Sequence, residues 1–172
     1  MNRPEILFIG GRSGVGKSTV AFALHDLLAS KDVTHAVIEG DALDLAHPSP
    51  WRQRMAERNL AAVWSNYRDD GYHRLIYTNT VSVLEVDELA AAVGGDPDVT
   101  SVLLQATDAT AKYRLERREH GDSLREHIER STKAASFLEK KAAPSVHRIP
   151  TGGRTPEEIA LVLADLAGWE AS

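Results

Sequence analysis

Residues 11–18 of the chain read Gly11-Arg12-Ser13-Gly14-Val15-Gly16-Lys17-Ser18. They fit the phosphate-binding pattern G-x4-G-K-[ST] at every fixed position. Glycines let such a loop bend so that successive backbone N–H groups point inward and surround an anion. The Lys17 ammonium can reach the β- and γ-phosphates of a nucleotide, and the Ser18 hydroxyl can ligate Mg²⁺. The motif therefore predicts a site for nucleotide phosphate.

The flanking sequence supports this interpretation. Residues 5–9 form an apolar run of strand length, and residues 18–28 repeat apolar side chains at spacings of three and four, which is typical of a helix. A strand, a glycine loop and a helix in this order aim the helix N-terminus at bound phosphate. The alternative is a glycine-rich turn that precedes Lys-Ser by chance. Background residue frequencies make such a chance match rarer than about one in a hundred in a chain this long.

Composition limits the classes of function. The chain has 172 residues, which suits one domain covering residues 1–172. Its 20 Lys and Arg against 25 Asp and Glu give a net charge of −5, which argues against a general nucleic-acid binder. It has no cysteine for disulfide or thiolate chemistry, and its seven histidines lack metal-ligand spacing. No signal peptide or membrane span is recognisable, so we expect a soluble cytoplasmic protein without nucleic-acid or membrane partners.

Strand and helix signals alternate along the chain, which predicts an α/β fold with a parallel sheet covered by helices on both faces. The expected strands cover residues 5–9, 34–39, 74–80, 100–106 and 146–149, and the expected helices cover residues 18–28, 51–68, 86–93, 108–118, 123–142 and 155–167. Asp108 is expected to cap the fourth helix, and Thr155 the last one. Ligands of such sheets collect at the carboxyl ends of the strands. Segments 10–19, 40–41, 78–80, 107–108 and 151–154 should therefore line one crevice.

Two other classes of phosphate-loop protein fit poorly. GTPases carry an Asn-Lys-x-Asp guanine reader, which this chain lacks. Oligomeric ATPase motors use a longer chain and an apolar strand that ends in Asp-Glu, and residues 83–88 imitate that ending. They lead directly into the apolar run 89–93, so we interpret them as the acidic first turn of a helix. An Asp after the second strand and an arginine-rich helix after the fourth suit a kinase that acts on a small molecule.

The sequence resembles the small P-loop kinases, which include gluconate kinase, chloramphenicol phosphotransferase and the tunicamycin-resistance-protein-like group. The resemblance lies in the loop 10–19, in Glu39-Gly40-Asp41, in Arg114-Leu115-x-x-Arg118 and in the closing segment 150–158. It covers nearly the whole chain in element order, although only the phosphate loop is a specific motif. It implies a three-layer P-loop NTPase fold with a five-stranded parallel sheet in the order 2-3-1-4-5, a helical lid at about residues 114–130, and ATP with Mg²⁺ as phosphate donor.

The same resemblance bears on the acceptor. The chain lacks the substrate segment that follows the third strand in gluconate kinase, which speaks against gluconate as the substrate. Thr78-Asn79-Thr80 followed by a short helix looks closer to the tunicamycin-resistance-like group. The antibiotic itself is not carried over.

Most residues expected to bind the nucleotide lie in the loop. They are Gly11, Ser13, Gly14, Val15, Gly16, Lys17, Ser18 and Thr19, with Ser18 as the metal ligand. Arg114 and Arg118 share a helix face and could close on the triphosphate, whereas Arg117 should face solvent or a glutamate. Arg154 follows the last strand, where the resembled kinases hold the adenine edge, and could stack on the base. The alternatives are a solvated charged helix face and an ordinary loop residue.

Lys17, Asp41 and Arg118 are the expected catalytic residues. In the resembled family an Asp at the position of Asp41 faces the acceptor, and a carboxylate there can take the proton of the attacking hydroxyl. Glu39 and Asp44 are alternative bases, and Asp41 could instead be a turn residue. Strand alternation should place Glu39 on the face opposite Ile38.

The segment of about residues 41–68 is expected to select the acceptor. Of its aromatic residues we expect Trp64 in the core and Trp51 in a pocket wall, while Tyr67 and the arginines suit a ring-bearing or anionic acceptor. On the following helix, Arg125 and Arg130 flank His127 and could meet an anionic group of the acceptor.

The sequence thus predicts an ATP-dependent kinase that phosphorylates a hydroxyl of a sugar, a nucleoside or an antibiotic-like molecule, acting as a monomer or homodimer. One alternative is a nucleotide-binding regulatory protein or weak ATPase without an acceptor. Another is a nucleotide or sugar-nucleotide kinase.

Overall fold

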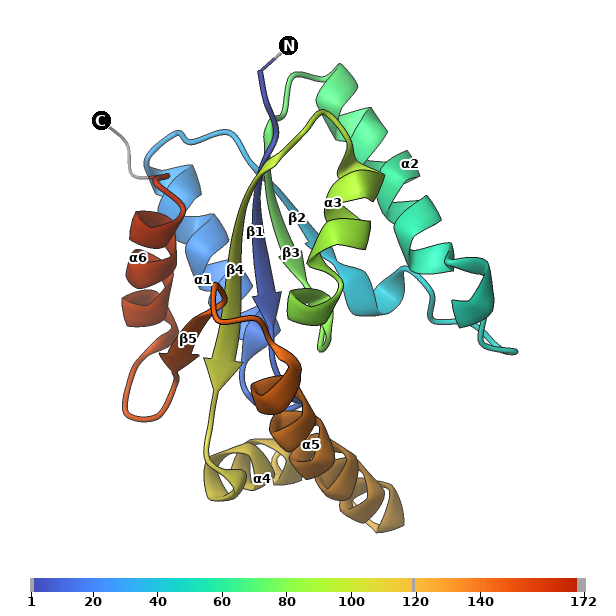
Figure 1. Cartoon of the computed structure of the whole chain (residues 1–172). Helices are drawn as coiled ribbons and strands as arrows, with labels where there is room; N and C mark the ends of the chain where they lie inside the picture. The colour runs from blue at the N-terminus through green and yellow to red at the C-terminus, as the bar shows by residue number, and fades with distance from the viewer. Residues whose placement is uncertain (1, 119, 170–172) are drawn as a thin grey trace.

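The five strands form one parallel sheet in a computed structural model that describes residues 2–118 and 120–169. The strands are β1 (Glu5–Gly10), β2 (Ala36–Glu39), β3 (Arg74–Thr78), β4 (Asp98–Gln105) and β5 (His147–Pro150). Their order is β2-β3-β1-β4-β5, so the phosphate loop leaves the central strand (Figure 1). The predicted fold and strand order are confirmed.

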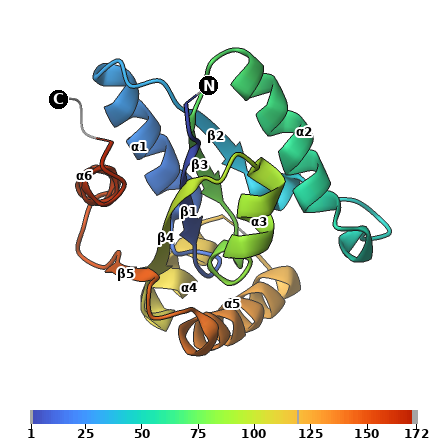
Figure 2. The same ribbon diagram turned by 45° about the horizontal axis from the view of Figure 1, so that its top comes forward.

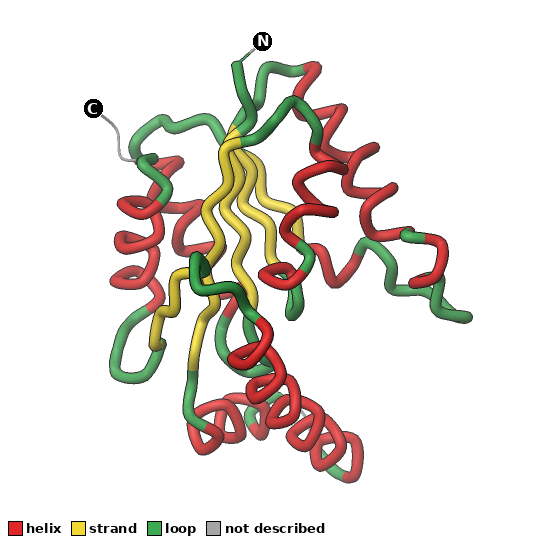
Figure 3. The backbone as a smooth tube through the Cα atoms, in the orientation of Figure 1, coloured by secondary structure: helices red, strands yellow, loops and turns green. Residues whose placement is uncertain are grey.

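Helices cover both faces of the sheet and its carboxyl end. They are α1 (Lys17–Ser30), α2 (Met55–Asp69), α3 (Val86–Val93), α4 (Asp108–Glu116), α5 (Asp122–Lys141) and α6 (Pro156–Leu166). Helices α1 and α6 pack on one face, and α2 and α3 on the other (Figures 1 and 2). Helices α4 and α5 lie beyond the carboxyl ends of the strands (Figure 3). Among the described residues, no helix combines the length and the apolar character needed to span a membrane.

The central strand is buried on both faces, which explains its continuous apolar sequence. Leu7 and Ile9 face the core formed with α1 and α6, whereas Ile6 and Phe8 face the core formed with α2 and α3. Trp64 lies in the second core and is 1% exposed, which confirms its prediction as a core residue.

The second helix starts later than the sequence predicts. Residues Trp51–Gln53 form a separate 3₁₀ turn, closed by a 3.0 Å hydrogen bond from Gln53 N to Pro50 O. Arg54 then adopts a left-handed conformation with φ 51°, and α2 begins at Met55. A non-glycine residue in that region interrupts helical hydrogen bonding, so the predicted start at residue 51 is wrong.

The two predicted helix caps have different outcomes. Thr155 caps α6, and Glu158 completes a capping box with it, as its sequence predicts. At α4 the cap is Thr107, whose hydroxyl accepts a 3.2 Å hydrogen bond from Thr110 N. Asp108 is therefore not the cap, and its carboxylate pairs with Arg12 of the phosphate loop instead.

Candidate active site

The phosphate loop joins β1 to α1 through residues in backbone conformations that favour glycine. Gly14 has φ 81° and Gly16 has φ 102°, both in the left-handed region. A Cβ on Gly14 would lie 2.7 Å from Ala111 O, because α4 passes directly over the loop. Gly16 caps α1 without a side chain. The first N–H groups of α1 therefore remain available to an anion at the positive end of the helix dipole.

Lys17 is buried at the start of α1. Its Nζ donates hydrogen bonds to Gly11 O at 2.8 Å and to Arg12 O at 3.3 Å. The ammonium group therefore contacts the first residues of the phosphate loop. Burial lowers the pKa of Lys17; the Asp41 carboxylate raises this pKa, and the Arg118 guanidinium lowers it. The fold thus brings the charges of all three predicted catalytic residues within electrostatic reach of one another.

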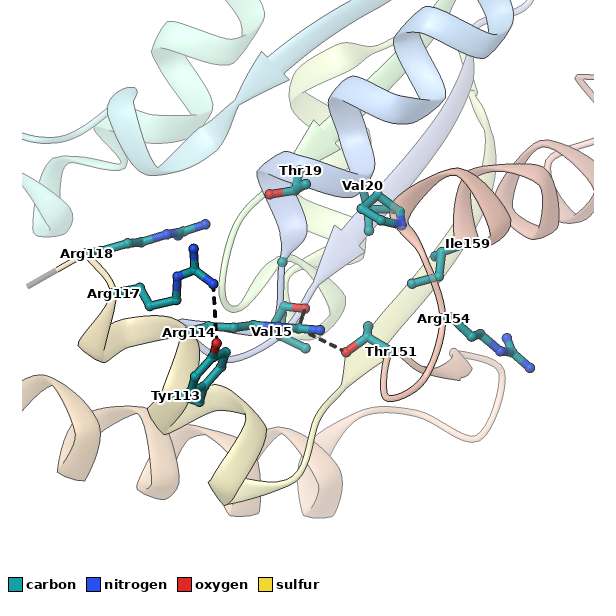
Figure 4. A pocket seen from close by; sticks show the side chains of 12 residues that line it. Val15, Thr19, Val20, Tyr113, Arg114, Arg117, Arg118, Thr151, Arg154 and Ile159 are labelled. Atoms are coloured by element: carbon teal, nitrogen blue, oxygen red, sulfur yellow. Dashed lines mark hydrogen bonds between the residues drawn. The ribbon is translucent and has the colours of Figure 1, made fainter.

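Arg114 on α4 holds the backbone of the phosphate loop by hydrogen bonds. Its Nη1 donates to Val15 O at 2.8 Å, to Gly14 O at 3.4 Å and to the Thr151 hydroxyl at 3.2 Å (Figure 4). The Thr151 hydroxyl donates in turn to Gln105 O at 3.1 Å. In this arrangement Arg114 holds the loop backbone, and its predicted contact with phosphate stays a prediction.

A cavity of about 490 Å³ opens beside the late part of the loop. Its walls come from the loop, α1, the end of α4 with the two residues after it, the segment between β5 and α6, and the start of α6 (Figure 4). They comprise Val15, Gly16, Thr19, Val20, Tyr113, Arg114, Arg117, Arg118, Thr151, Arg154, Pro156 and Ile159. Apolar walls with several cationic side chains suit a nucleoside joined to phosphates.

One wall of this cavity is formed by a residue that was not predicted from the sequence, Tyr113. Tyr113 is exposed on α4, and its hydroxyl accepts a 3.3 Å hydrogen bond from Arg117. The Arg117 guanidinium carbon lies 5.8 Å from the centre of the Tyr113 ring. Arg117 is exposed, as expected, but it also lines the cavity. The spacing of four between an aromatic and an arginine is the signal that could have indicated this pair.

Asp41 follows β2, which lies on the opposite side of central β1 from β4 and β5, the strands whose following segments line the larger cavity. The 3₁₀ turn Gly40–Ala42 follows β2 directly and presents Asp41 at the carboxyl end of the sheet. Glu39 is exposed and Ile38 buried, which confirms the predicted alternation. Further carboxylates gather nearby: burial raises the pKa of Glu85, and Glu57, Glu88 and Asp44 raise it further.

A second, smaller cavity of about 200 Å³ lies beside the early part of the loop. Its lining includes Ser13, Thr80, His127 and Arg130, so the structure brings two of the three predicted α5 side chains to the loop. Arg125 is not among the lining residues. The loop therefore separates a larger cavity next to residues 15–16 from a smaller one next to residue 13.

The predicted acceptor segment is only partly at the site. Trp64 and Tyr67 are packed together, with ring centres 6.4 Å apart, and Tyr67 also meets Tyr72 at 5.3 Å. Arg54 pairs with Glu57 at 3.0 Å. The side chain of Trp51 lies outside the part of the chain that the structure describes.

Gly40 is needed for close packing next to Asp41. A Cβ at residue 40 would lie 2.2 Å from the Tyr77 hydroxyl, and Tyr77 is fully buried with its ring 5.7 Å from Phe8. We expect Gly40→Ala to lower the free energy of unfolding by about 1–3 kcal/mol, because the ring has no room to withdraw. Urea denaturation measures this change. Gly152→Ala is the matched control, since nothing lies within 4 Å of its added Cβ, and equal stability of the two variants would contradict the prediction.

Comparison with known proteins finds one matching family model and several solved structures of similar fold. A family model described as adenylylsulphate kinase matches residues 3–63, which include the phosphate loop and Asp41. A tunicamycin resistance protein from Deinococcus radiodurans has the same fold, with a TM-score of 0.65 and 19% identity over 98% of each chain. The fold is that of the small P-loop kinases.

Two further solved structures have a similar fold. A gluconokinase from Sinorhizobium meliloti 1021 superposes with a TM-score of 0.60 and 21% identity, over 97% of this chain and 96% of that one. The Mycobacterium tuberculosis APS kinase CysC, solved in complex with AMPPNP and APS, gives a TM-score of 0.59 and 24% identity over 98% and 99%. No curated protein sequence matches the chain significantly. The expected resemblance to small P-loop kinases is confirmed at the level of the fold.

Proposed function

We propose that the protein is an ATP-dependent phosphotransferase that transfers the γ-phosphoryl group of ATP to a hydroxyl of a small molecule. The observation that carries this proposal is the order of the strands around the phosphate loop. The loop follows central β1, segments after β4 and β5 line the nucleoside-sized cavity, and Asp41 follows β2 on the opposite side of β1. The Asp41 carboxylate also acts on the charge of buried Lys17. A site that only held a nucleotide would not need a carboxylate opposite the loop. The gluconokinase and the APS kinase of the same fold support the proposal.

The donor fits the larger cavity. Its nucleoside would lie against Val20, Ile159 and Tyr113, and its phosphates would follow Gly16 into the loop. Arg118 lines the same cavity and also acts on the charge of Lys17, which supports a contact between Arg118 and the polyphosphate. In Figure 4, Arg154 extends from the segment before α6, away from Arg114, Arg117 and Arg118, and would reach the base only by turning inward. The AMPPNP complex of an APS kinase of this fold supports ATP as the donor.

Mg²⁺ fits the residues present. Mg²⁺ in kinases commonly uses one or two protein oxygen atoms together with phosphates and water. Ser18 is exposed in the first turn of α1, directly after Lys17, and its hydroxyl is the expected ligand. When bound, the ion would neutralise charge on the phosphates.

The proposed reaction is an in-line transfer. The acceptor oxygen forms a bond to the γ-phosphorus while the bond from that phosphorus to the β–γ bridging oxygen breaks, and ADP leaves. Asp41 orients the acceptor hydroxyl and takes its proton. Lys17, the loop amides and Arg118 stabilise the charge that develops on the transferred group. We also propose that the enzyme works in the cytoplasm, where ATP is available, as a monomer or a homodimer.

A panel of acceptors tests this function. Purified protein with Mg²⁺ and ATP is assayed for ADP formation in the presence of nucleosides, sugars, aminoglycosides, gluconate and adenylyl sulfate. We expect at least one acceptor to raise the rate about 10²-fold or more above basal hydrolysis, the usual contribution of acid–base catalysis. If no member of a broad panel raises the rate although ATP binds, the phosphotransferase proposal fails. A nucleotide-binding regulatory protein would then be the better interpretation.

A further inference from the structure

Arg12 is a charged loop residue that the proposed reaction does not use. Its side chain is 4% exposed, although it stands in the loop predicted to bind phosphate. All three guanidinium nitrogens have protein partners: Nε donates to the Ser131 hydroxyl at 2.9 Å, Nη2 to the Thr132 hydroxyl at 3.2 Å, and Nη1 to the Asp108 carboxylate. The guanidinium is thus directed into protein, where a buried charge is stable only if it is paired and hydrogen-bonded.

The partners of Arg12 flank the predicted lid on both sides. Asp108 stands at the start of α4, before residues 114–130, and Ser131 and Thr132 follow these residues on α5. Helices α4 and α5 pack against each other, and they lie side by side beyond the sheet (Figures 1 and 3). One buried side chain of the phosphate loop therefore ties together the two ends of the segment that carries Arg118 and Arg130.

A second contact also joins α5 to the phosphate loop. The Ser131 hydroxyl, which accepts from Arg12, donates to Ser13 O at 2.7 Å, and Ser131 is 2% exposed. On the loop side, Arg12 O accepts from Lys17 Nζ at 3.3 Å. The chain of contacts consequently runs from the ammonium that would hold the phosphates, through Arg12, to the base of the predicted lid.

We propose that Arg12 is a positioning residue that fixes the base of the 114–130 segment to the phosphate loop, so that Arg118, just after α4, and Arg130 on α5 keep their places relative to bound phosphate. This inference rests on the proposed function for its kinetic consequence but not for its structural one. Arg12 does not contact the nucleotide in this scheme. Its planar fork matches three acceptors at once, which a lysine ammonium on a flexible stem would not do equally well.

The kinetic test compares Arg12→Met, Arg12→Lys and Lys133→Ala. Lys133 is an exposed cation next to Thr132, so Lys133→Ala is the matched control for loss of one positive charge on this side of the molecule. For Arg12→Met we expect kcat for transfer to fall about 10- to 100-fold, the effect of misplacing groups by about an ångström. The Kd for AMPPNP should change less than about threefold, because the loop amides and Lys17 remain. Arg12→Lys should recover part of kcat, and the control should match the wild type.

The structural test needs no kinase activity. The chain has no cysteine, so Lys31→Cys and Glu126→Cys provide two unique positions for nitroxide labels, one at the end of α1 and one on α5. We expect a narrow distribution of distances between the labels in the otherwise wild-type protein and a broadened one with Arg12→Met. If Arg12→Met does not fold, the double variant Ser131→Ala/Thr132→Val removes two of the three partners and is measured in the same way.

The possible results separate the two proposals. If Arg12→Met broadens the distance distribution but no acceptor of the panel is phosphorylated, the role of Arg12 is supported and the proposed phosphotransferase activity is not. An unchanged distribution with unchanged kcat would overturn the role of Arg12. Loss of AMPPNP affinity equal to the loss of kcat would also overturn it, since Arg12 would then act on the shape of the loop and not on the lid.

Discussion

Lys17→Ala should weaken nucleotide binding strongly. The Lys17 ammonium is the buried cation at the start of α1, already within 2.8 Å of the loop carbonyl of Gly11. Two unit charges 4 Å apart interact by about 4 kcal/mol at an effective dielectric constant of 20, which corresponds to about a thousandfold in affinity. Since the helix N-terminus retains part of the attraction, we expect calorimetry with AMPPNP and Mg²⁺ to show a loss of at least about 10²-fold.

The control for this variant removes a lysine from the same helix. Lys31 caps the carboxyl end of α1 and is exposed, so Lys31→Ala should bind AMPPNP like the wild type. If Lys17→Ala also binds AMPPNP like the wild type, the polyphosphate does not lie in the loop. The nucleotide site would then be assigned wrongly, whichever acceptor the enzyme uses.

The lowered pKa of Lys17 should make both the stability of the protein and its affinity for AMPPNP depend on pH. Between its pKa in the folded protein and the unfolded value of 10.5, the unfolded chain binds more protons than the folded one. Stability of the nucleotide-free protein should therefore rise with pH in this window, as far as Lys17 determines it. Affinity for AMPPNP should fall across the same window, because the neutral amine no longer attracts phosphate. Lys17→Ala should remove both slopes, and urea denaturation and calorimetry at several pH values measure them.

The architecture could be predicted from the sequence because its signals are local. The apolar run 5–9, the glycines of the loop and the periodicity of residues 18–28 each report on neighbours within a few positions. The strand order came from the resemblance to kinases and is confirmed. The short helix at Val86–Val93 was also predictable, since its acidic first turn and the glycines after it mark both ends.

The contacts that tie the loop to α4 and α5 could not be predicted in this way. Arg12 meets Ser131 across 119 positions of sequence, and nothing near Arg12 distinguishes it from an exposed loop residue. Asp108 looked like a helix cap because caps are a local pattern, but a long-range ion pair with Arg12 takes its carboxylate. The start of α2 was misjudged because the left-handed Arg54 has no sequence signal comparable to glycine.

Asp41→Asn should slow phosphate transfer to the acceptor and leave nucleotide binding nearly unchanged. Asparagine keeps the size of the side chain and removes the charge that would take the proton of the acceptor hydroxyl. We expect the rate of acceptor phosphorylation to fall by about 10²-fold or more, while AMPPNP affinity stays within about threefold of the wild type. Single-turnover assays with the best acceptor of the panel, together with calorimetry, measure the two quantities.

Two neighbouring carboxylates serve as controls for Asp41 because each is an alternative base. Glu39→Gln changes the exposed end of β2, and Asp44→Asn changes a residue whose charge acts on Glu85 and so belongs to the acidic surroundings. If Asp41 is the base, both variants should keep most of the transfer rate. If Asp41→Asn transfers phosphate normally and one of the other two does not, that residue is the base.

Because Asp41 raises the pKa of Lys17, neutralising Asp41 should also lower that pKa further and move the alkaline loss of AMPPNP affinity to lower pH. A shift of this kind without loss of transfer would show that Asp41 lies at the site and tunes Lys17, but does not accept the proton.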